Sequence, residues 1–315
     1  MNLLVTGGAG FIGSHFVLRH VSGFPKDNVI VLDKLTYAAD RTFLDPVAGR
    51  IAFLQGDIAD QRLIEKLVRE HAIDTIVNFA AESHVDRSIE SAAPFLQTNI
   101  LGVQSLIEVC REHPDVRLLH VSTDEVYGDV ADEDPPRRVG DALWPSSPYA
   151  ASKAAAEMLL FAAMRTYAVK WCISRCTNNY GPHQASEKFI PTVIRHALKD
   201  ESVPIYAQGK NKRDWIYVTD HCDALEMLLK TEWGDKSHLF NVGGHNEHEN
   251  IEVAKMILDI LGKPHSLLTS VPDRPGHDWR YAVEDSAIRK LGWAPKVNFD
   301  EGLKRTAEWY RQRLA

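Results

Sequence analysis

A glycine-rich turn near the start of the chain constrains its fold more than any other feature. A short apolar segment at 2–6 runs directly into Gly7-Gly8-Ala9-Gly10-Phe11-Ile12-Gly13, and residues 14–20 have a helical pattern. Strand, glycine turn and helix in this order let a pyrophosphate approach the backbone amides at a helix N-terminus. Glycine-rich turns also form for purely steric reasons. The position between a strand and a helix favours a dinucleotide-binding turn.

Strand patterns then alternate with helical patterns along the first half of the chain. The predicted strands are 29–33, 51–55, 75–79, 118–122 and 169–175, and the clearest helices between them are 62–71 and 95–112. Such alternation is typical of a parallel sheet that helices cover on both faces. The sequence predicts an α/β fold with a doubly wound parallel sheet of the Rossmann type.

The alternating pattern loosens at 178–182, which reads as an irregular polar segment and indicates a change of domain. We predict a dinucleotide-binding domain over 1–177, to which 212–243 returns. A smaller α/β substrate domain comprises 178–211 and 244–315. The elements expected after the boundary are helices at 187–200, 251–261 and 302–313 and short strands at 203–206, 214–218 and 239–242, the last two of which lie in the returning segment.

Composition excludes several classes of function. A net charge of −7 and a pI near 6.1 disfavour nucleic-acid binding, which requires clustered cations. No apolar run approaches the length of a membrane span, and no secretory signal pattern is present at the N-terminus. The cysteines lie in predicted core segments without metal-ligand or disulfide spacing: Cys110, Cys172, Cys176 and Cys222. We expect a cytoplasmic protein with no membrane or nucleic-acid partner.

Two acids indicate where the adenosine half of a dinucleotide would bind. Asp33 ends the second predicted strand, where a carboxylate can bind ribose hydroxyls and repel a 2′-phosphate. This favours NAD over NADP, although Lys34 beside it weakens the preference. Asp57 follows the third strand and suits the adenine edge, or alternatively caps a helix. Small residues at 79–83 leave room for the dinucleotide after the fourth strand.

The candidate chemistry lies in two short segments. Tyr149 and Lys153 are one helical turn apart, so the ammonium can lie near the phenol and favour its ionised form as a base. Asp124 and Glu125 follow the buried fifth strand, at the edge where α/β proteins bind ligands. Either pattern alone fits an ordinary helix or a solvated loop with capping acids. Together they favour acid/base chemistry at a bound nicotinamide.

The chain resembles the extended short-chain dehydrogenase/reductases that act on nucleotide sugars, and among them the dTDP-glucose 4,6-dehydratases. The resemblance runs essentially end to end. Its segments are 7–13, 32–38, 79–89, 121–128 (Val-Ser-Thr-Asp-Glu-Val-Tyr-Gly), 147–153, 175–182, 187–191 and 273–281. The Thr123-Asp124-Glu125 triplet is specific to the dehydratase branch, whereas related epimerases keep only the serine or threonine.

The resemblance implies a three-stage reaction with tightly held NAD. Tyr149 takes the proton of the sugar O4 while the C4 hydride passes to NAD. Glu125 then removes the C5 proton as Asp124 protonates the departing 6-hydroxyl, and water leaves. The hydride returns to C6 and Glu125 returns its proton to C5, which yields a 4-keto-6-deoxy sugar. One acid must be protonated and the other ionised at the same moment, which neighbouring carboxyls in a dry site can achieve.

Further roles also follow from the resemblance alone. Thr123 would bind O4, and Lys153 would hold the nicotinamide ribose. The other implied NAD contacts are Gly7, Gly10, Phe11, Ile12, Gly13, Asp33, Lys34, Leu35, Thr36, Asp57, Ile58, Ala80, Ala81, Ser83, Thr98, Tyr149 and Asn179. Besides the triplet, the implied substrate contacts are Ser83, Asn178, Lys188, Phe189, Pro204, Tyr206, Arg213, Asn250, Arg274, His277 and Tyr281. The chain departs from the family pattern at 37–40 and 206–213, so the choice between thymine and uracil stays open.

Three alternatives remain at this stage. A nucleotide-sugar 4-epimerase would use NAD and Tyr149 but would not need the two acids, and a silent dinucleotide sensor would need none of these groups. His245 and His248 have the spacing of metal ligands, but their segment reads as a polar loop before a helix and lacks a third ligand, so no metal is expected. The resemblance also implies a homodimer through a four-helix bundle formed by helices at 95–112 and 152–166; alternatively, these helices only cover the sheet.

Overall fold

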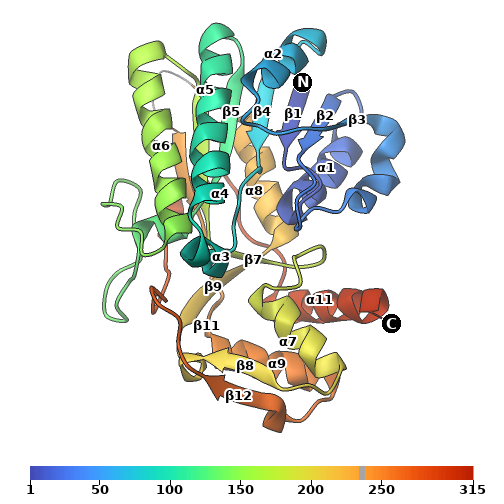
Figure 1. Ribbon diagram of the computed structural model, residues 1–315, viewed down its shortest axis with the longest axis vertical. Coiled ribbons are helices and arrows are strands. Elements are labelled where there is room, and N and C mark those ends of the chain that lie inside the picture. The colour runs from blue at the N-terminus through green and yellow to red at the C-terminus, as the bar shows by residue number, and fades with distance from the viewer. Residues whose placement is uncertain (234–237, 315) are drawn as a thin grey trace.

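The computed structural model describes residues 1–233 and 238–314. Its larger part is a seven-stranded sheet in the order β10-β6-β5-β4-β1-β2-β3, with every neighbouring pair parallel (Figure 1). The strands are β1 (Asn2–Thr6), β2 (Asn28–Asp33), β3 (Ile51–Gln55), β4 (Thr75–Asn78), β5 (Arg117–Thr123), β6 (Trp171–Cys176) and β10 (His238–Val242). The predicted doubly wound parallel sheet is confirmed.

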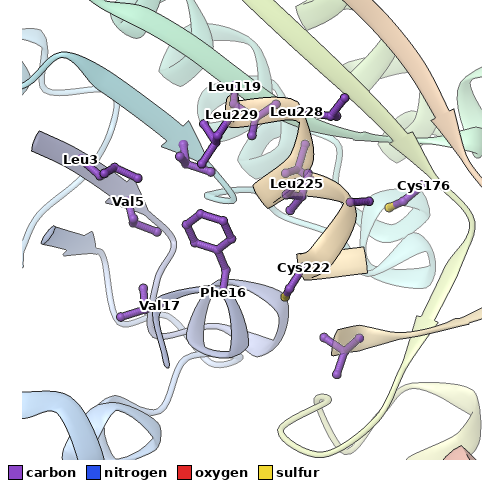
Figure 2. Packing of buried hydrophobic residues seen from close by; sticks show 14 of the residues in the cluster. Leu3, Val5, Phe16, Val17, Leu119, Cys176, Cys222, Leu225, Leu228 and Leu229 are labelled. Atoms are coloured by element: carbon purple, nitrogen blue, oxygen red, sulfur yellow. The ribbon is translucent and has the colours of Figure 1, made fainter. Parts of the chain in front are cut away.

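Helices cover both faces of this sheet because successive side chains of its strands point to opposite sides. Leu3 joins one core with Phe16 and Leu225 (Figure 2). Its neighbour Leu4 joins the core on the other face. The first core lies under α1 (Phe11–Gly23) and α8 (Val218–Lys230), and the second under α2 (Gln61–Glu70), α5 (Gly102–Glu112) and α6 (Pro148–Tyr167).

The helix predicted at 95–112 contains an irregularity. It runs through α4 (Ala93–Phe95), η2 (Leu96–Leu101) and α5, and η2 is π-helical, a form that is frequent at functional sites. Buried Asn99 in η2 accepts from the N–H of Glu82 and donates to the carbonyl of Glu82, both at 2.9 Å. It also donates to the Ser152 hydroxyl at 2.8 Å. Asn99 therefore joins the loop after β4 to α6.

The smaller part contains two short sheets and its own apolar core. One sheet has the order β11 (Glu247–Glu249), β9 (Lys212–Tyr217), β7 (Asn178–Tyr180), and the other pairs β12 (Leu268–Val271) with β8 (Val203–Tyr206). Around them lie α7 (Phe189–Leu198), α9 (Asn250–Leu261) and α11 (Phe299–Leu314). The remaining elements are η1 (Arg41–Arg50), α3 (Val85–Glu90), η3 (Asp124–Tyr127), η4 (Ala207–Gly209), η5 (His265–Leu267) and α10 (Ser286–Lys290).

Two local predictions were wrong, and one helix was missed. The segment 178–182 is not irregular throughout, because β7 pairs with β9 in parallel. The polar stretch at 245–249 is not only a loop, since β11 pairs with β9 in antiparallel register. Both strands are three residues long, too short for an alternating pattern to show. Helix α8 follows β9 directly and was not separated from it in the sequence.

The domain division stays a prediction. Within 212–243, β10 joins the large sheet and α8 packs against α1, whereas β9 belongs to the three-stranded sheet. Positions 234–237 and 315 of the predicted ranges lie outside the described residues.

Candidate active site

A cleft of about 280 Å³ lies at the carboxyl ends of the parallel strands. Its walls come from the turn after β1, the segments after β2 to β6, and the start of α6. The cleft is lined by most of the predicted cofactor residues: Gly7, Gly10, Phe11, Ile12, Gly13, Asp33, Lys34, Thr36, Asp57, Ile58, Ala80, Ala81, Ser83, Thr98, Tyr149, Lys153 and Asn179. Leu35 does not line it; its N–H instead donates to Asp33 Oδ1 at 2.8 Å.

The glycine turn leaves no space for side chains. A Cβ on Gly13 would lie 2.3 Å from the carbonyl oxygen of Gly7. Gly7 has a φ of 69°, and a Cβ there would meet the backbone nitrogen of Ala80 at 2.5 Å. The turn therefore brings bare backbone at the N-terminus of α1 to the wall of the cleft, which fits a pyrophosphate.

Substituting Gly13 with alanine is expected to abolish dinucleotide retention and lower the melting temperature, because the methyl group collides with backbone that cannot move aside. The matched control is Gly23→Ala at the end of α1, where a Cβ meets no atom within 4 Å. Cofactor content after gel filtration and thermal unfolding measure both effects. Equal cofactor content in the two variants would contradict this role of the turn.

Asp33 and Lys34 have partners that bear on ribose recognition. Asp33 Oδ2 accepts from the N–H of Ala9 at 2.9 Å, which ties the carboxylate to the glycine turn. Burial raises the pKa of Asp33, and its backbone N–H donors from Leu35 and Ala9 oppose that shift. Lys34 forms an ion pair with Asp57 at 2.7 Å. The positive charge beside Asp33 is thus already paired, which disfavours a role in holding a 2′-phosphate.

Tyr149 lies in the first turn of α6. Ser147 caps the helix by accepting from the N–H of Ala150 at 3.1 Å, and Pro148 occupies its first turn. Tyr149 is buried against Phe95 with ring centroids 6.3 Å apart. This places the phenol at a fixed position in the wall of the cleft.

The electrostatics around Tyr149 differ from the prediction. Its pKa is raised, first by burial and then by Glu125, while the hydrogen bond from Thr123 opposes the shift. Lys153 Nζ bonds to the carbonyl of Val121 at 2.7 Å and to His120 Nε2 at 3.2 Å. Burial also lowers the pKa of Lys153 to about 8.

Asp124 and Glu125 occupy the short helix η3 that terminates β5. Thr123 caps it, and its hydroxyl accepts from the N–H of Glu125 at 3.3 Å. Asp124 is 3% exposed, and its Oδ2 has no hydrogen-bond partner. Burial, followed by repulsion from Glu125, raises its pKa well above the usual range. A carboxyl in this environment stays protonated and can act as an acid.

Glu125 differs from its neighbour in the cations that surround it. Burial raises its pKa, but Lys188, Arg213 and Arg274 all oppose that shift. These cations favour the ionised form of Glu125, whereas the carboxylates of Glu125 and Asp214 favour the protonated form of Asp124. The cleft holds one carboxyl suited to donate a proton and one suited to accept one.

The predicted substrate residues fall into two groups. Ser83, Asn178, Lys188 and the triplet line the cleft. The others do not line it: Phe189, Pro204, Tyr206, Arg213, Asn250, Arg274, His277 and Tyr281. Arg213 and Arg274 nevertheless lower the pKa of Glu125, and burial together with the charge of Glu125 raises the pKa of Tyr281, so all three side chains lie near Glu125.

Both arginines among the predicted substrate contacts already have partners within the protein. Arg213 donates to the carbonyls of Lys212, Asp278 and Trp279 and stacks over the ring of Tyr281 at 4.4 Å. Arg274 Nη1 pairs with Asp86 at 2.6 Å, while its buried Nε has no partner. Arg274 thus keeps a free donor.

The remaining predicted contacts are more scattered. The Tyr206 and His277 rings meet edge to face at 6.3 Å, and Phe189 stacks with Trp215. The side-chain oxygens of Asn178 and Asn250 are buried without a partner.

Several residues at the site carried no recognisable sequence signal. His120 lies inside β5 and holds Lys153, and His221 on α8 bonds to Asn179 Oδ1 at 2.9 Å. Cys176, Thr177 and Gln184 also line the cleft. Single polar residues within apolar strands and helices look like core histidines or cysteines, and only the tertiary contacts reveal their neighbours.

The histidine pair considered as a metal site has other partners. His245 bonds to Asp285 at 2.9 Å, whereas His248 stacks on Phe299 at 4.7 Å. Over residues 1–233 and 238–314, no cluster of three or more histidine, cysteine, aspartate or glutamate side chains is arranged to hold a metal ion. In the same ranges no helix is long and apolar enough to cross a membrane.

A dinucleotide-type glycine turn, together with a tyrosine and a lysine one turn apart on a helix at the same cleft, defines the class of extended short-chain dehydrogenase/reductases. Sequence comparison narrows this class. The chain belongs to the family described as GDP-mannose 4,6 dehydratase, which matches residues 4–306. The resemblance to nucleotide-sugar 4,6-dehydratases is confirmed.

Individual relatives agree with this. The chain is 44% identical to dTDP-glucose 4,6-dehydratase of Streptomyces niveus, over 100% of this chain and 94% of the relative. The dTDP-glucose 4,6-dehydratase of Mycobacterium tuberculosis strain H37Rv is 45% identical over 99% and 93%.

Solved structures extend the comparison. The dTDP-glucose 4,6-dehydratase of Streptomyces venezuelae, crystallised with NAD, matches with a TM-score of 0.95 and 44% identity over 99% of this chain and 97% of that one. A UDP-glucose 4-epimerase of Thermus thermophilus in complex with NAD has a TM-score of 0.91 at 32% identity, over 99% of both chains. The fold is thus common to dehydratases and epimerases, and the site must discriminate between them.

Proposed function

We propose that this chain is a NAD-dependent dTDP-glucose 4,6-dehydratase, a hydro-lyase that forms the 4-keto-6-deoxy sugar. The observation that carries this proposal is the unequal acid pair, Asp124 and Glu125, beside Tyr149 in one cleft. A 4-epimerase needs no acid and base of this kind. The curated relatives named dTDP-glucose 4,6-dehydratase support the same nucleotide sugar.

The residues of the chain divide the proton transfers. Bound NAD supplies the oxidation at sugar C4 and the matching reduction at C6. Tyr149 accepts the O4 proton, and Thr123 holds O4 and orients the phenol. Glu125 takes the C5 proton, exchanges it with solvent and later protonates C5, while Asp124 gives the proton with which the 6-hydroxyl leaves as water. Over one cycle the substrate loses one water, Tyr149 gains a proton and Asp124 loses one, and exchange with solvent resets both.

The cofactor fits the cleft as the chain builds it. The bare glycine turn would hold the pyrophosphate and Asp33 the adenosine ribose, and Lys153 and Asn179 line the wall nearer the acids. A carboxylate at the ribose and a paired Lys34 support NAD in preference to NADP.

The proposal is tested by mass spectrometry of the products formed from dTDP-glucose and from UDP-glucose, in ordinary and deuterated water. We expect loss of one water, incorporation of one solvent deuteron at C5, and faster turnover of the thymine nucleotide. Faster reaction of UDP-glucose would redirect the proposal to a UDP-glucose 4,6-dehydratase. An unchanged mass with inverted C4 would identify a 4-epimerase.

Substitutions of the two acids are expected to block different steps of the reaction. Glu125→Gln should abolish deuterium incorporation at C5, because the amide cannot accept the proton. Asp124→Asn should retain exchange at C5 but slow water loss by about 10²- to 10⁴-fold, the range for general acid catalysis. Isotope incorporation and product release are measured on both variants. If both variants lose the same step to the same degree, the division of roles is wrong.

We also propose a homodimer through a bundle of α5 and α6 with their counterparts. Its support is the exposed apolar side chains of this helical layer: Leu96 and Leu101 on η2 and Met158 on α6. Leu101→Glu is expected to shift the sedimenting species toward the monomer. Leu291→Glu, at an exposed leucine beyond α10, is the control. A monomeric wild-type protein would refute the dimer.

We propose a cytoplasmic location because of the state of the cysteines. All four are buried and free, and burial raises the pKa of Cys110 and of Cys176 to about 12. Buried neutral thiols are typical of a reducing compartment. Fractionation of the source cells would test this.

A further inference from the structure

A row of polar side chains crosses three neighbouring strands beneath α6. Thr6 of β1 pairs in register with Asn78 of β4, and Asn78 pairs with His120 of β5. Two residues earlier, the same strands carry Leu4, Ile76 and Leu118 of the apolar core under α6. The polar row therefore lies on the same face of the sheet, between that core and the cleft.

Hydrogen bonds connect this row to Lys153. Thr6 Oγ1 lies 2.6 Å from Asn78 Oδ1, Asn78 Nδ2 lies 3.0 Å from His120 Nδ1, and His120 Nε2 lies 3.2 Å from Lys153 Nζ. Thr6, Asn78 and His120 are at most 1% exposed, and none of the three lines the cleft. The row is thus a buried series of hydrogen bonds that ends at Lys153 and is closed to solvent.

The pattern of donors and acceptors in this hydrogen-bonded row depends on the charge of Lys153. With the Asn78 amide oriented as in the structure, His120 Nδ1 accepts a hydrogen bond. A neutral imidazole then carries its proton on Nε2, which faces Lys153. An ammonium group has no lone pair, so Lys153 completes this arrangement only as a neutral amine. It still donates one N–H to the carbonyl of Val121.

A second arrangement satisfies the same groups with a charged lysine. If the amide of Asn78 turns over, its oxygen accepts from His120 Nδ1–H and its nitrogen donates to the Thr6 hydroxyl. His120 Nε2 then accepts from the ammonium of Lys153. The amide oxygen and nitrogen of Asn78 exchange places and the Thr6 hydroxyl changes from donor to acceptor, whereas His120 and Lys153 keep their positions. Beyond that exchange, the two arrangements differ in hydrogen positions and in one proton on Lys153.

We infer that His120 is a positioning residue for Lys153, because its two neutral tautomers let the buried row of Thr6 and Asn78 hold Lys153 both as an ammonium and as an amine. A site that must release and regain protons at Tyr149 would use such a partner to keep Lys153 in place through both charge states. The kinetic consequence rests on the proposed function, whereas the tautomer exchange does not.

The charges around the pair are consistent with titration of Lys153 and not of His120. Burial and the charge of Lys153 lower the pKa of His120 well below its usual value, so the ring stays neutral. Burial lowers the pKa of Lys153 to about 8, while Glu157 on α6 and Cys176 on β6 oppose that shift. Arg175 on β6 pairs with Glu157, and Asp124 of η3 adjoins Cys176.

The test is nitrogen NMR of the holoenzyme labelled with ¹⁵N-histidine, followed across the pH range around the Lys153 pKa. The His120 signals are assigned by their loss in His120→Gln. We expect the protonated and unprotonated ring nitrogens to exchange places at one midpoint, without formation of the imidazolium. A single tautomer at every pH overturns the inference, whatever the substrate proves to be.

Kinetics supply a second measurement. In His120→Leu the ammonium loses an acceptor, so the alkaline limb of the kcat profile should move down by about one pH unit, a tenfold change in the Lys153 protonation equilibrium. His120→Gln, which keeps an amide oxygen, should restore part of the shift. If His120→Leu lowers kcat but the alkaline limb of its pH profile does not move, His120 contributes only packing, and the inference is overturned.

Discussion

Replacing Tyr149 by phenylalanine is expected to lower kcat by about 10²- to 10⁴-fold, because the variant lacks the proposed acceptor of the O4 proton. The phenol is buried in the cleft beside Glu125 and Thr123, so water is poorly placed to substitute for it. Steady-state turnover of dTDP-glucose measures the loss. Cofactor content and melting temperature should stay close to wild type, since the ring and its contact with Phe95 are retained.

Tyr167→Phe is the matched control for that experiment. Tyr167 lies at the opposite end of the same helix, 51% exposed, and does not line the cleft. Its variant should turn over at the wild-type rate. A Tyr149→Phe enzyme that does the same would refute the proposed base.

Replacing Arg175 by methionine is expected to cost about 3–5 kcal/mol of unfolding free energy, the typical cost of breaking a buried ion pair. Arg175 is 2% exposed and Glu157 is fully buried. Arg175 Nε donates to Glu157 Oε2 at 3.0 Å, and the Ser122 hydroxyl donates to Oε1 at 2.5 Å. Without the guanidinium, a carboxylate remains in the core without its counter-charge.

The control is the double variant Glu157→Leu/Arg175→Met. Removing both charges leaves no unpaired ion, so we expect the double variant to recover much of the stability lost in Arg175→Met. Urea denaturation of the wild type and of all three variants, including Glu157→Leu, gives the coupling energy. An Arg175→Met protein within about 0.5 kcal/mol of wild type would contradict a structural role for the pair.

The sequence allowed the large sheet and the centre of the site to be predicted because both depend on local patterns. The glycine turn and the apolar strands around it are continuous in the chain, and Asp124 and Glu125 follow a strand that could be recognised. Parallel strands bring their ends to one edge, so the meeting of these acids with Tyr149 followed from topology.

What could not be predicted depends on contacts between distant segments. Lys153 was expected to act on Tyr149, but its partners are His120 and a strand carbonyl that no spacing rule indicates. The role of Asn99 arises from a π-helical turn, whose residues have the composition of an ordinary helix. β7 became a strand because β9, more than thirty residues later, provides its partner.

The attachment of α6 to β5 has a consequence for how substrate preference can change. Lys153 and Glu157, one turn apart on α6, bond to His120 and Ser122, two residues apart on β5. The phenol and the two carboxyls are therefore borne by a single stiff block, whereas Arg213, Arg274 and Tyr281 are carried by other segments. With these three residues as the proposed substrate contacts, a lineage can exchange the nucleotide or sugar that it accepts by altering those segments, while the spacing of its proton-transfer groups is inherited unchanged.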